Sequence, residues 1–315
     1  MEKIAVIGVG LMGHGIAQIF ALHGFPVCLR DIRDDILDKA LTNIRANLVL
    51  LTQHGIIQEK DVEPAVARLS ITTETARAVD SADFVFEAAS ENLELKQKLF
   101  EELDRLCPAE TILASNTSVM SITEIGSRTR NRERVVGTHF WNPPYLIPLV
   151  EVIRSKHTAD TVVDRTIELL DRVGKHPVRV NKDVPGFVGN RLQHALWREA
   201  ISIVEHGIAD AATVDECIKY GFGLRLPILG PMENADLVGT DLTLAIHDYI
   251  LKHLERSPDP SPLLREIVAR GDLGFKSGQG FQKWSSEEIQ KTHNRLKVYL
   301  LKVTSQMRES EGGRA

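Results

Sequence analysis

Three glycines near the start of the chain have the spacing of a phosphate-binding turn. They form the pattern G-x-G-x-x-G between a short apolar run, residues 4–7, and a helical pattern. In such a turn the first glycine permits the tight bend, the second lets the backbone approach a pyrophosphate, and the third lets the helix pack closely. Free N–H groups at the start of the helix favour an anion. We therefore expect a dinucleotide to contact Gly8, Gly10, Leu11, Met12 and Gly13.

An acidic residue indicates which dinucleotide binds. Asp31 follows the next expected strand, residues 26–30, at the position where a carboxylate binds the adenosine ribose hydroxyls and repels a 2′-phosphate. NAD is therefore expected rather than NADP. Two alternatives stay open: Arg33 as the partner of a 2′-phosphate, and a glycine-rich turn in an unrelated α/β fold.

The elements that must position these residues change in character along the chain. Up to residue 180, apolar runs alternate with helical patterns; after residue 185, helical patterns dominate. This predicts an α/β protein with an N-terminal Rossmann-type doubly wound parallel sheet, residues 1–183, and a smaller all-helical C-terminal domain, residues 184–315. Strands are expected at 4–7, 26–30, 71–73, 82–89, 111–114, 135–140, 149–153 and 176–180. Helices are expected at 34–53, 61–69, 160–173, 187–206, 212–220, 231–254, 261–270 and 285–307.

Composition limits the class of protein. The 315 residues are 43% hydrophobic and 26% charged with a net charge of −5, which argues against a nucleic-acid partner. No apolar run is long enough to span a bilayer, and an early strand leaves no room for a leader. Cys28, Cys107 and Cys217 lack metal-ligand spacing, so we expect no metal and reduced thiols in a cytoplasmic protein. The helices after residue 185 have more apolar surface than one bundle needs, which predicts a homodimer through that domain.

Several longer motifs carry a family resemblance. They read G-V-G-L-M-G-H-G-I-A, E-A-A-S-E-N-L-E-L-K, A-S-N-T-S, H-F-W-N-P, L-V-E-V, K-H-P-V, P-G-F-V-G-N-R and G-F-K-S-G-Q-G-F. In this order they resemble the NAD-dependent L-3-hydroxyacyl-CoA dehydrogenase family along nearly the whole chain. The resemblance implies an oxidoreductase of fatty acid metabolism that uses NAD.

Two residues suit the chemistry of alcohol oxidation. Removing a hydride from a secondary alcohol needs a base for the hydroxyl proton. His139 ends an expected strand, and Glu151 on the following strand would fix the imidazole tautomer and stabilise the imidazolium. The family uses such a His–Glu pair, so both are predicted to be catalytic; a hydrogen-bonded core histidine is the alternative.

The resemblance assigns further site residues. Ser118 and Asn190 match polar groups that hold the substrate's 3-oxygen, with helix capping as the alternative for each. Lys96 lies on a charged helical stretch whose alternative is a solvated face, and the reach of Lys276 rests on the resemblance alone. Positions that touch the cofactor are matched by Glu91, Lys96, Ser118, Asn142 and Lys276.

Three departures bear on the substrate. Relatives that use CoA carry a lysine pair where this chain has Gln53-His54, so a phosphate contact is missing. The stretch N-P-P-Y-L-I-P-L-V-E is similar to the lambda-crystallin branch, L-gulonate 3-dehydrogenase. That branch and carnitine dehydrogenases also have an arginine like Arg225, which suits a free carboxylate; a structural salt bridge is its alternative.

These observations predict hydride transfer at the 3-carbon of a short-chain 3-hydroxyacyl-CoA such as 3-hydroxybutyryl-CoA. The alternative substrate is a free hydroxy acid, L-gulonate or a carnitine-like carboxylate, and an aromatic hydroxymethyl or aldehyde compound comes after these. The alternative of another class is a catalytically inactive NAD-binding or crystallin-like protein.

Overall fold

The computed structural model describes residues 1–312. The chain divides into two compact units. The first comprises Met1–Arg191 together with the chain from Leu296 onward, and the second comprises Leu192–Arg295. Most of the predicted site residues belong to the first unit.

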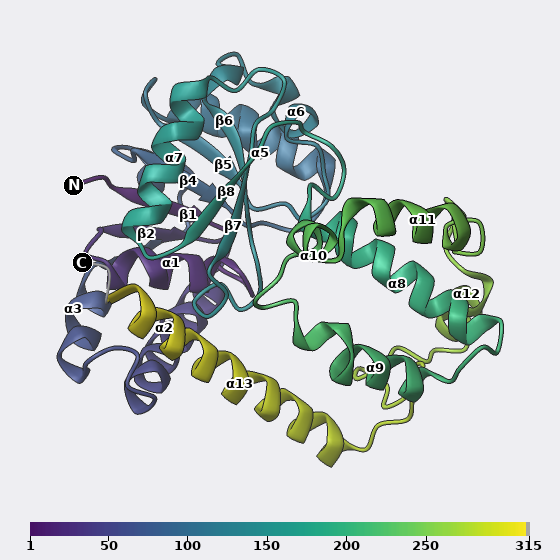
Figure 1. The fold of residues 1–315 in the computed structure, drawn as a ribbon. Coiled ribbons are helices and arrows are strands. Elements are labelled where there is room, and N and C mark those ends of the chain that lie inside the picture. Colours follow the sequence, from purple (N-terminus) through teal and green to yellow (C-terminus); the bar gives the residue numbers. More distant parts are fainter. Residues whose placement is uncertain (313–315) are drawn as a thin grey trace. The chain divides into compact units, whose positions relative to one another are not determined.

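The first unit contains an eight-stranded sheet in the order β3-β2-β1-β4-β5-β6-β7-β8 (Figure 1). Strands β1 to β6 are parallel, whereas β7 is antiparallel to β6 and β8 is parallel to β7. The reversal follows from the short β6–β7 connection, because a parallel return needs a crossover of about a dozen residues or more. The strands are β1 (Ile4–Ile7), β2 (Val27–Arg30), β3 (Leu69–Thr72), β4 (Phe84–Glu87), β5 (Ile112–Ser115), β6 (Val135–Phe140), β7 (Leu149–Ile153) and β8 (His176–Val180).

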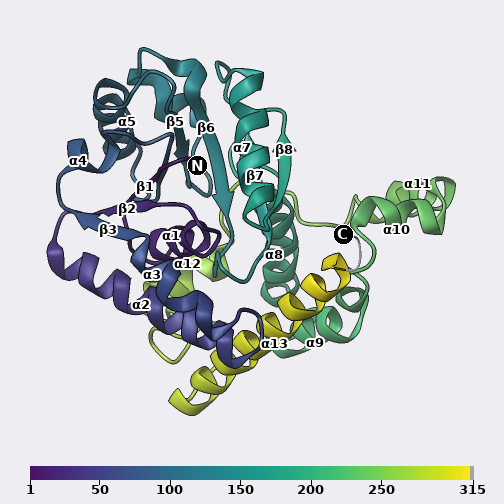
Figure 2. The same ribbon diagram turned by 90° about the vertical axis from the view of Figure 1, so that its left-hand side faces the viewer.

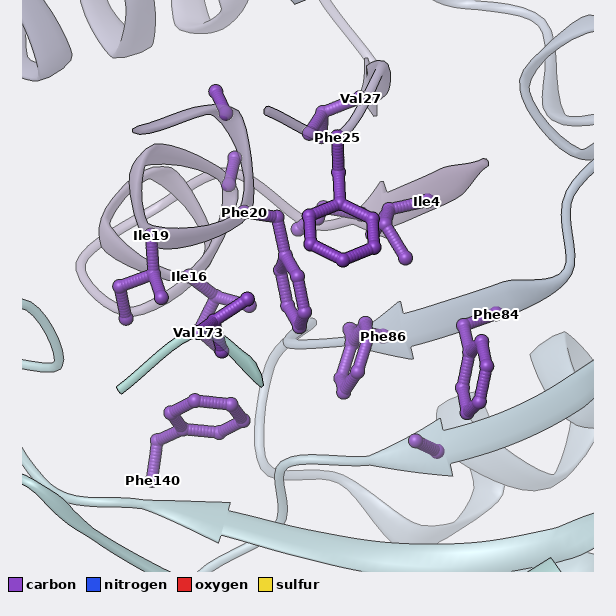
Figure 3. Packing of buried hydrophobic residues seen from close by; sticks show 14 of the residues in the cluster. Ile4, Ile16, Ile19, Phe20, Phe25, Val27, Phe84, Phe86, Phe140 and Val173 are labelled. Carbon is purple, nitrogen blue, oxygen red and sulfur yellow. The ribbon is translucent and has the colours of Figure 1, made fainter. Parts of the chain in front are cut away.

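Helices cover both faces of this sheet (Figure 2). Alternate strand residues point to opposite faces, so each face has its own apolar core. On one face Phe20, Phe86 and Phe140 pack together, with ring centroids 4.8 Å apart for the first two and 6.1 Å apart for the last two (Figure 3). That face packs against α1 (Gly13–Leu22), α2 (Asp34–Gln53), α3 (Val62–Ala67) and α7 (Asp160–Arg172). The other packs against α4 (Thr75–Val79), α5 (Leu93–Leu106) and α6 (Ile122–Ile125).

The second unit is helical, as the sequence predicts. The expected helix over residues 231–254 is broken into two at Gly239, whose φ of 103° is incompatible with a continuous helix. The helices that follow the sheet are α8 (Gly189–Glu205), α9 (Ala211–Tyr220), α10 (Pro231–Val238), α11 (Thr240–Ile250), α12 (Pro262–Ala269) and α13 (Ser286–Gly312).

The last part of α13 belongs with the first unit. Leu301 is buried against Leu51 and Leu146, and the Thr304 hydroxyl donates to the Leu146 carbonyl at 3.0 Å. The sequence prediction placed all of residues 184–315 in the second domain. The structure differs at this end because the apolar side of α13 has its partners on the α2 end and on the loop before β7.

Within residues 1–312, no helix is both long enough and apolar enough to cross a membrane.

Candidate active site

The glycine turn lies where the strand order of the sheet reverses. Strand β1 has β2 on one side and β4 on the other, and ligands of open α/β sheets bind at the carboxyl ends of strands at such a point. Gly8 has a φ of 85°, and a Cβ there would lie 2.7 Å from the Ala89 nitrogen. A Cβ on Gly13 would lie 1.8 Å from the Gly8 carbonyl oxygen. Two of the three glycines are therefore required by the packing of the protein itself.

Gly10 is different, because a Cβ there would meet nothing within 4 Å. The open face of Gly10 suits the close approach of a pyrophosphate, so the turn fits the dinucleotide that the sequence predicts. Met12 is the residue before the first turn of α1, and Leu11 is exposed. The chain thus has room for a ligand at the one glycine whose expected role is ligand contact.

Asp31 stands directly after β2 and orders the same turn. Its carboxylate accepts hydrogen bonds from the Val9 and Ile32 N–H groups, both at 2.8 Å. Arg33, the candidate partner of a 2′-phosphate, instead pairs with Asp35 at 3.0 Å on the surface. The acidic group at the ribose position and the engaged arginine both favour NAD over NADP.

His139 and Glu151 form a buried hydrogen-bonded pair. They face each other across β6 and β7, and the His139 Nδ1 lies 2.8 Å from the Glu151 Oε2. A carboxylate only accepts, so the proton of a neutral His139 is on Nδ1 and its Nε2 carries a lone pair. The ring also lies 5.1 Å from the Trp141 ring and 5.9 Å from the Phe187 ring. This arrangement fixes the tautomer and the orientation of the imidazole and leaves its Nε2 able to accept a proton.

The second oxygen of Glu151 is held by the backbone. Oε1 accepts the N–H groups of Val188 and Gly189, each at 2.9 Å, where α8 begins. Burial raises the pKa of Glu151, but the hydrogen bonds from His139, Gly189 and Val188 outweigh burial and leave the pKa below its ordinary value. Glu151 is therefore ionised and able to stabilise a positive charge on His139.

Ser118 and Asn190 come together beside this pair of strands. The Asn190 side-chain amide donates to the Ser118 carbonyl oxygen at 2.8 Å, and Ser118 is exposed. The alternative prediction that Ser118 caps a helix is wrong, because the side chain of Ser121 caps α6. The Asn190 amide has a second N–H, and the Ser118 hydroxyl has no hydrogen bond within the described residues, so both groups are available to a ligand.

Lys96 is buried rather than on a solvated face. Its side chain is 1% exposed, and its Nζ lies 2.6 Å from Glu87, 3.2 Å from the Ala89 carbonyl and 3.4 Å from Glu91. Glu91 is partly exposed and accepts the Ser118 N–H at 3.0 Å. Lys96 thus holds the loop after β4 in place, and Glu91 of that loop in turn binds the backbone N–H of Ser118.

Sequence reasoning missed Glu87. This carboxylate is fully buried and accepts from Lys96, from the Ser115 hydroxyl at 2.6 Å and from the Ala89 N–H at 2.7 Å. A signal was present, since Glu87 is an acidic residue inside the apolar stretch F-V-F-E-A-A, where an uncompensated charge is costly.

The three remaining predicted residues are exposed. Asn142 is exposed and precedes a cis peptide bond to Pro143. Arg225 and Lys276 are exposed residues of the second unit. Within residues 1–312 no ion pair involves Arg225, so the salt-bridge alternative has no support.

The position that bears on CoA is the end of α2. Gln53 is the last residue of α2, His54 follows it, and Gly55 turns the chain with a φ of 69°. The C-terminal end of a helix carries partial negative charge, so a phosphate there needs a cation. Gln53 is uncharged and supplies no such cation.

Over the described part of the chain, no three His, Cys, Asp or Glu side chains are grouped as ligands for a metal ion.

Comparison with known proteins gives consistent matches over both units. Residues 3–184 match the family model for the 3-hydroxyacyl-CoA dehydrogenase NAD binding domain, and residues 186–284 match the model for the C-terminal domain. A probable 3-hydroxybutyryl-CoA dehydrogenase of Bacillus subtilis is 39% identical over 288 residues, which cover 91% of this chain and 99% of that protein.

Other similar proteins have a different name. A 5-formyl-3-hydroxy-2-methylpyridine 4-carboxylate 5-dehydrogenase of Mesorhizobium japonicum is 34% identical over 288 residues, 91% of this chain and 92% of that protein. A crystal structure of an enzyme of this activity, described as an NAD⁺-dependent dismutase, superposes with a TM-score of 0.89 at 32% identity. The superposition covers 96% of this chain and 97% of the other.

Proposed function

The chain belongs to the 3-hydroxyacyl-CoA dehydrogenase family, and we propose that it transfers a hydride between NAD and the 3-carbon of a short-chain 3-hydroxyacyl-CoA such as 3-hydroxybutyryl-CoA. Proteins of this family are NAD-dependent oxidoreductases, and NAD is the cofactor of this chain. The observation that carries the proposal is the 2.8 Å hydrogen bond between His139 and Glu151 in the NAD-binding unit.

In the proposed mechanism the alcohol group of the substrate loses a proton from its oxygen and a hydride from its carbon. The Nε2 lone pair of His139 takes the hydroxyl proton, and Glu151 stabilises the imidazolium that results. The free N–H of Asn190 and the Ser118 hydroxyl donate to the oxygen as it becomes a ketone oxygen. NAD, when bound, supplies the acceptor for the hydride that leaves the same carbon. The reverse reaction returns the proton from His139.

The cofactor residues in this proposal are those of the glycine turn and its surroundings. Asp31 would bind the ribose hydroxyls, and the open face at Gly10 would receive the pyrophosphate. Lys96 would act through Glu91, because its own ammonium is buried among acceptors. The other residues proposed to touch NAD are Gly8, Leu11, Met12, Gly13, Ser118, Asn142 and Lys276.

A second candidate substrate is a compound with a free carboxylate. The proposal rests on Arg225, which is exposed and without an ion pair among the described residues, and on the lack of a lysine at Gln53-His54. The name of the Mesorhizobium japonicum relative also specifies a carboxylate on an aromatic ring. L-Gulonate, a carnitine-like carboxylate and such a pyridine carboxylate are the candidates in this class.

The molecular context is part of the proposal. We place the NAD-binding domain at residues 1–183 and the substrate and dimerisation domain in the helices after residue 184, except for the end of α13, which packs with the first unit. Large apolar side chains exposed in the second unit support a homodimer; among them are Tyr220, Ile228, Met232 and Leu237. Three free cysteines support a cytoplasmic location.

A substrate panel tests the proposal. Oxidation of NADH is measured with acetoacetyl-CoA, and reduction of NAD is measured with L-gulonate, carnitine and an aromatic alcohol that bears a carboxylate. Turnover of acetoacetyl-CoA well above that of the free acids is expected. Absence of turnover with acetoacetyl-CoA at millimolar concentration contradicts the thioester assignment. A protein that binds NADH but oxidises or reduces none of them would be the inactive binding protein.

A further inference from the structure

Phe187 has a backbone conformation that is unusual for its residue type. Among residues 1–312, it is the only residue other than glycine with a left-handed backbone, with a φ of 49°. For a bulky side chain this conformation costs free energy, and such residues persist where the surroundings hold them. The residue before it, Gly186, also has a positive φ of 75°, so the chain turns sharply between β8 and α8.

Packing of the ring holds Phe187 in place. The side chain is 1% exposed and belongs to the apolar core that also contains Phe100 of α5. The ring centroid lies 5.9 Å from that of His139, at an interplanar angle of 54°. Burial of the ring and its contact with the imidazole therefore offset the cost of the backbone.

The turn at Phe187 delivers two N–H groups to one carboxylate oxygen. Successive N–H groups converge on an anion when left-handed and right-handed residues adjoin. Here Val188 and Gly189 both donate to the Glu151 Oε1 at 2.9 Å, while Oε2 accepts from His139. The close fit extends to the next side chain, because a Cβ on Gly189 would lie 2.5 Å from Trp141.

We propose that Phe187 is a positioning residue for the His139–Glu151 pair. Its ring packs on the imidazole, and its left-handed backbone aims two amide donors at the carboxylate that orients that imidazole. The inference rests on the proposed function, in which His139 is the base. Glu151 is the ionisable group bonded to His139; the other ring contacts of His139, Trp141 and Phe187, are not ionisable at neutral pH.

The direction of the effect follows from the donors. Two N–H groups withdraw negative charge from Glu151, so they limit how strongly the carboxylate stabilises the imidazolium. When a smaller side chain replaces the ring of Phe187, the left-handed backbone at residue 187 loses the packing that supports it. The amides of Val188 and Gly189 then move away from the Glu151 Oε1, and His139 holds its proton more tightly. The acidic limb of the pH profile of kcat then shifts to higher pH.

Phe187→Leu is the test, and Phe100→Leu is its matched control in the same core. For Phe187→Leu we expect kcat to fall by up to about 10-fold. The acidic limb of the pH profile should move to higher pH by about half a pH unit or more, and the Kd for NADH should stay unchanged. Phe100→Leu should lower thermal stability with an unchanged pH profile. If both variants lose stability and neither shifts the profile, Phe187 is a core residue only.

Two further measurements keep the outcome decisive. Val188→Pro removes one of the two N–H donors outright, and it should shift the profile in the same direction even if Phe187→Leu folds poorly. The proton shared by His139 Nδ1 and Glu151 is also followed by NMR, which needs no substrate. Failure of the proposed function appears as wild-type protein that turns over no substrate. Failure of the inference appears as a His139 resonance and titration midpoint that both substitutions leave unchanged.

Discussion

His139 and Glu151 are directly opposite each other in the antiparallel pairing of β6 with β7, and the register alone brings Nδ1 and Oε2 to 2.8 Å. Residues directly opposite on neighbouring strands point to the same face, so no loop has to adjust to form the pair. The pairing of His139 with Glu151 therefore depends on the reversal of strand direction after β6, since a parallel neighbour would not arrive through so short a connection.

Replacing His139 by alanine tests whether this pair does the chemistry. His139→Ala should lower kcat about 100- to 10,000-fold, the range for removal of a general base, while the Kd for NADH stays near the wild-type value. The cofactor turn lies on β1 and α1, away from β6, which is why binding should survive. Stopped-flow turnover and NADH fluorescence titration measure the two quantities.

A suitable control is His176→Ala, which removes an exposed histidine of β8. It should leave both kcat and the Kd for NADH unchanged. Wild-type turnover by His139→Ala would remove His139 from the reaction.

The strands β6, β7 and β8 were predictable from sequence, but the pairing of β6 with β7 was not. Residues 135–140, 149–153 and 176–180 were predicted as strands with the bounds that the structure has, because apolar β-branched residues mark them clearly. The register of β6 on β7 depends on hydrogen bonds between distant residues, and no local pattern encodes it. The proximity of His139 and Glu151 was therefore predicted from a resemblance.

The features that sequence reasoning missed are of the same kind. The carboxylate of Glu87 and the turn at Phe187 acquire a role only through partners elsewhere in the chain. The break at Gly239 was locally visible as a glycine, but a glycine within a helical pattern does not by itself end a helix. Tertiary contacts likewise decide that the end of α13 joins the first unit.

The lowered pKa of Glu151 predicts how stability depends on pH. A carboxyl whose pKa is lower in the folded state than in the unfolded chain contributes stability that is complete above the unfolded value, near 4.5, and is lost as the pH falls through the lowered value. The free energy of unfolding of wild-type protein relative to Glu151→Gln should therefore decrease as the pH is lowered below about 4.5. Urea unfolding at a series of pH values measures this difference.

The sign of the trend is the decisive result for Glu151. A difference between the two proteins that stays constant, or that grows as the solution is acidified, would mean that the carboxyl is not held ionised by His139 and the two amides.

The buried pair of Lys96 and Glu87 predicts a large loss of stability on removal of one charge. Lys96→Met leaves the Glu87 carboxylate buried without its cation, which costs about 3–5 kcal/mol in the free energy of unfolding. The double variant Glu87→Gln with Lys96→Met removes both charges and should recover much of the loss. Urea unfolding provides these values.

Lys98→Met is the matched control on the same helix, because Lys98 pairs with Glu94 in an exposed i,i+4 arrangement. It should cost about 0.5 kcal/mol or less. A Lys96→Met variant as stable as Lys98→Met would show that the Glu87 carboxyl is protonated or reached by water.

Replacing Arg225 should change the KM of the two substrate classes differently. A guanidinium that grips a free carboxylate in two hydrogen bonds contributes about 1.5–3 kcal/mol, so Arg225→Ala should raise the KM of a carboxylate substrate about 10- to 100-fold. The acyl group of acetoacetyl-CoA has no free carboxylate, so its KM should change little. The matched control is Arg256→Ala, an exposed arginine of the same unit, which should affect neither substrate. Steady-state kinetics with each substrate class at saturating cofactor separates the outcomes: a rise confined to the carboxylate assigns Arg225 to substrate recognition, and equal KM values in variant and wild type make it a surface residue without a role in binding.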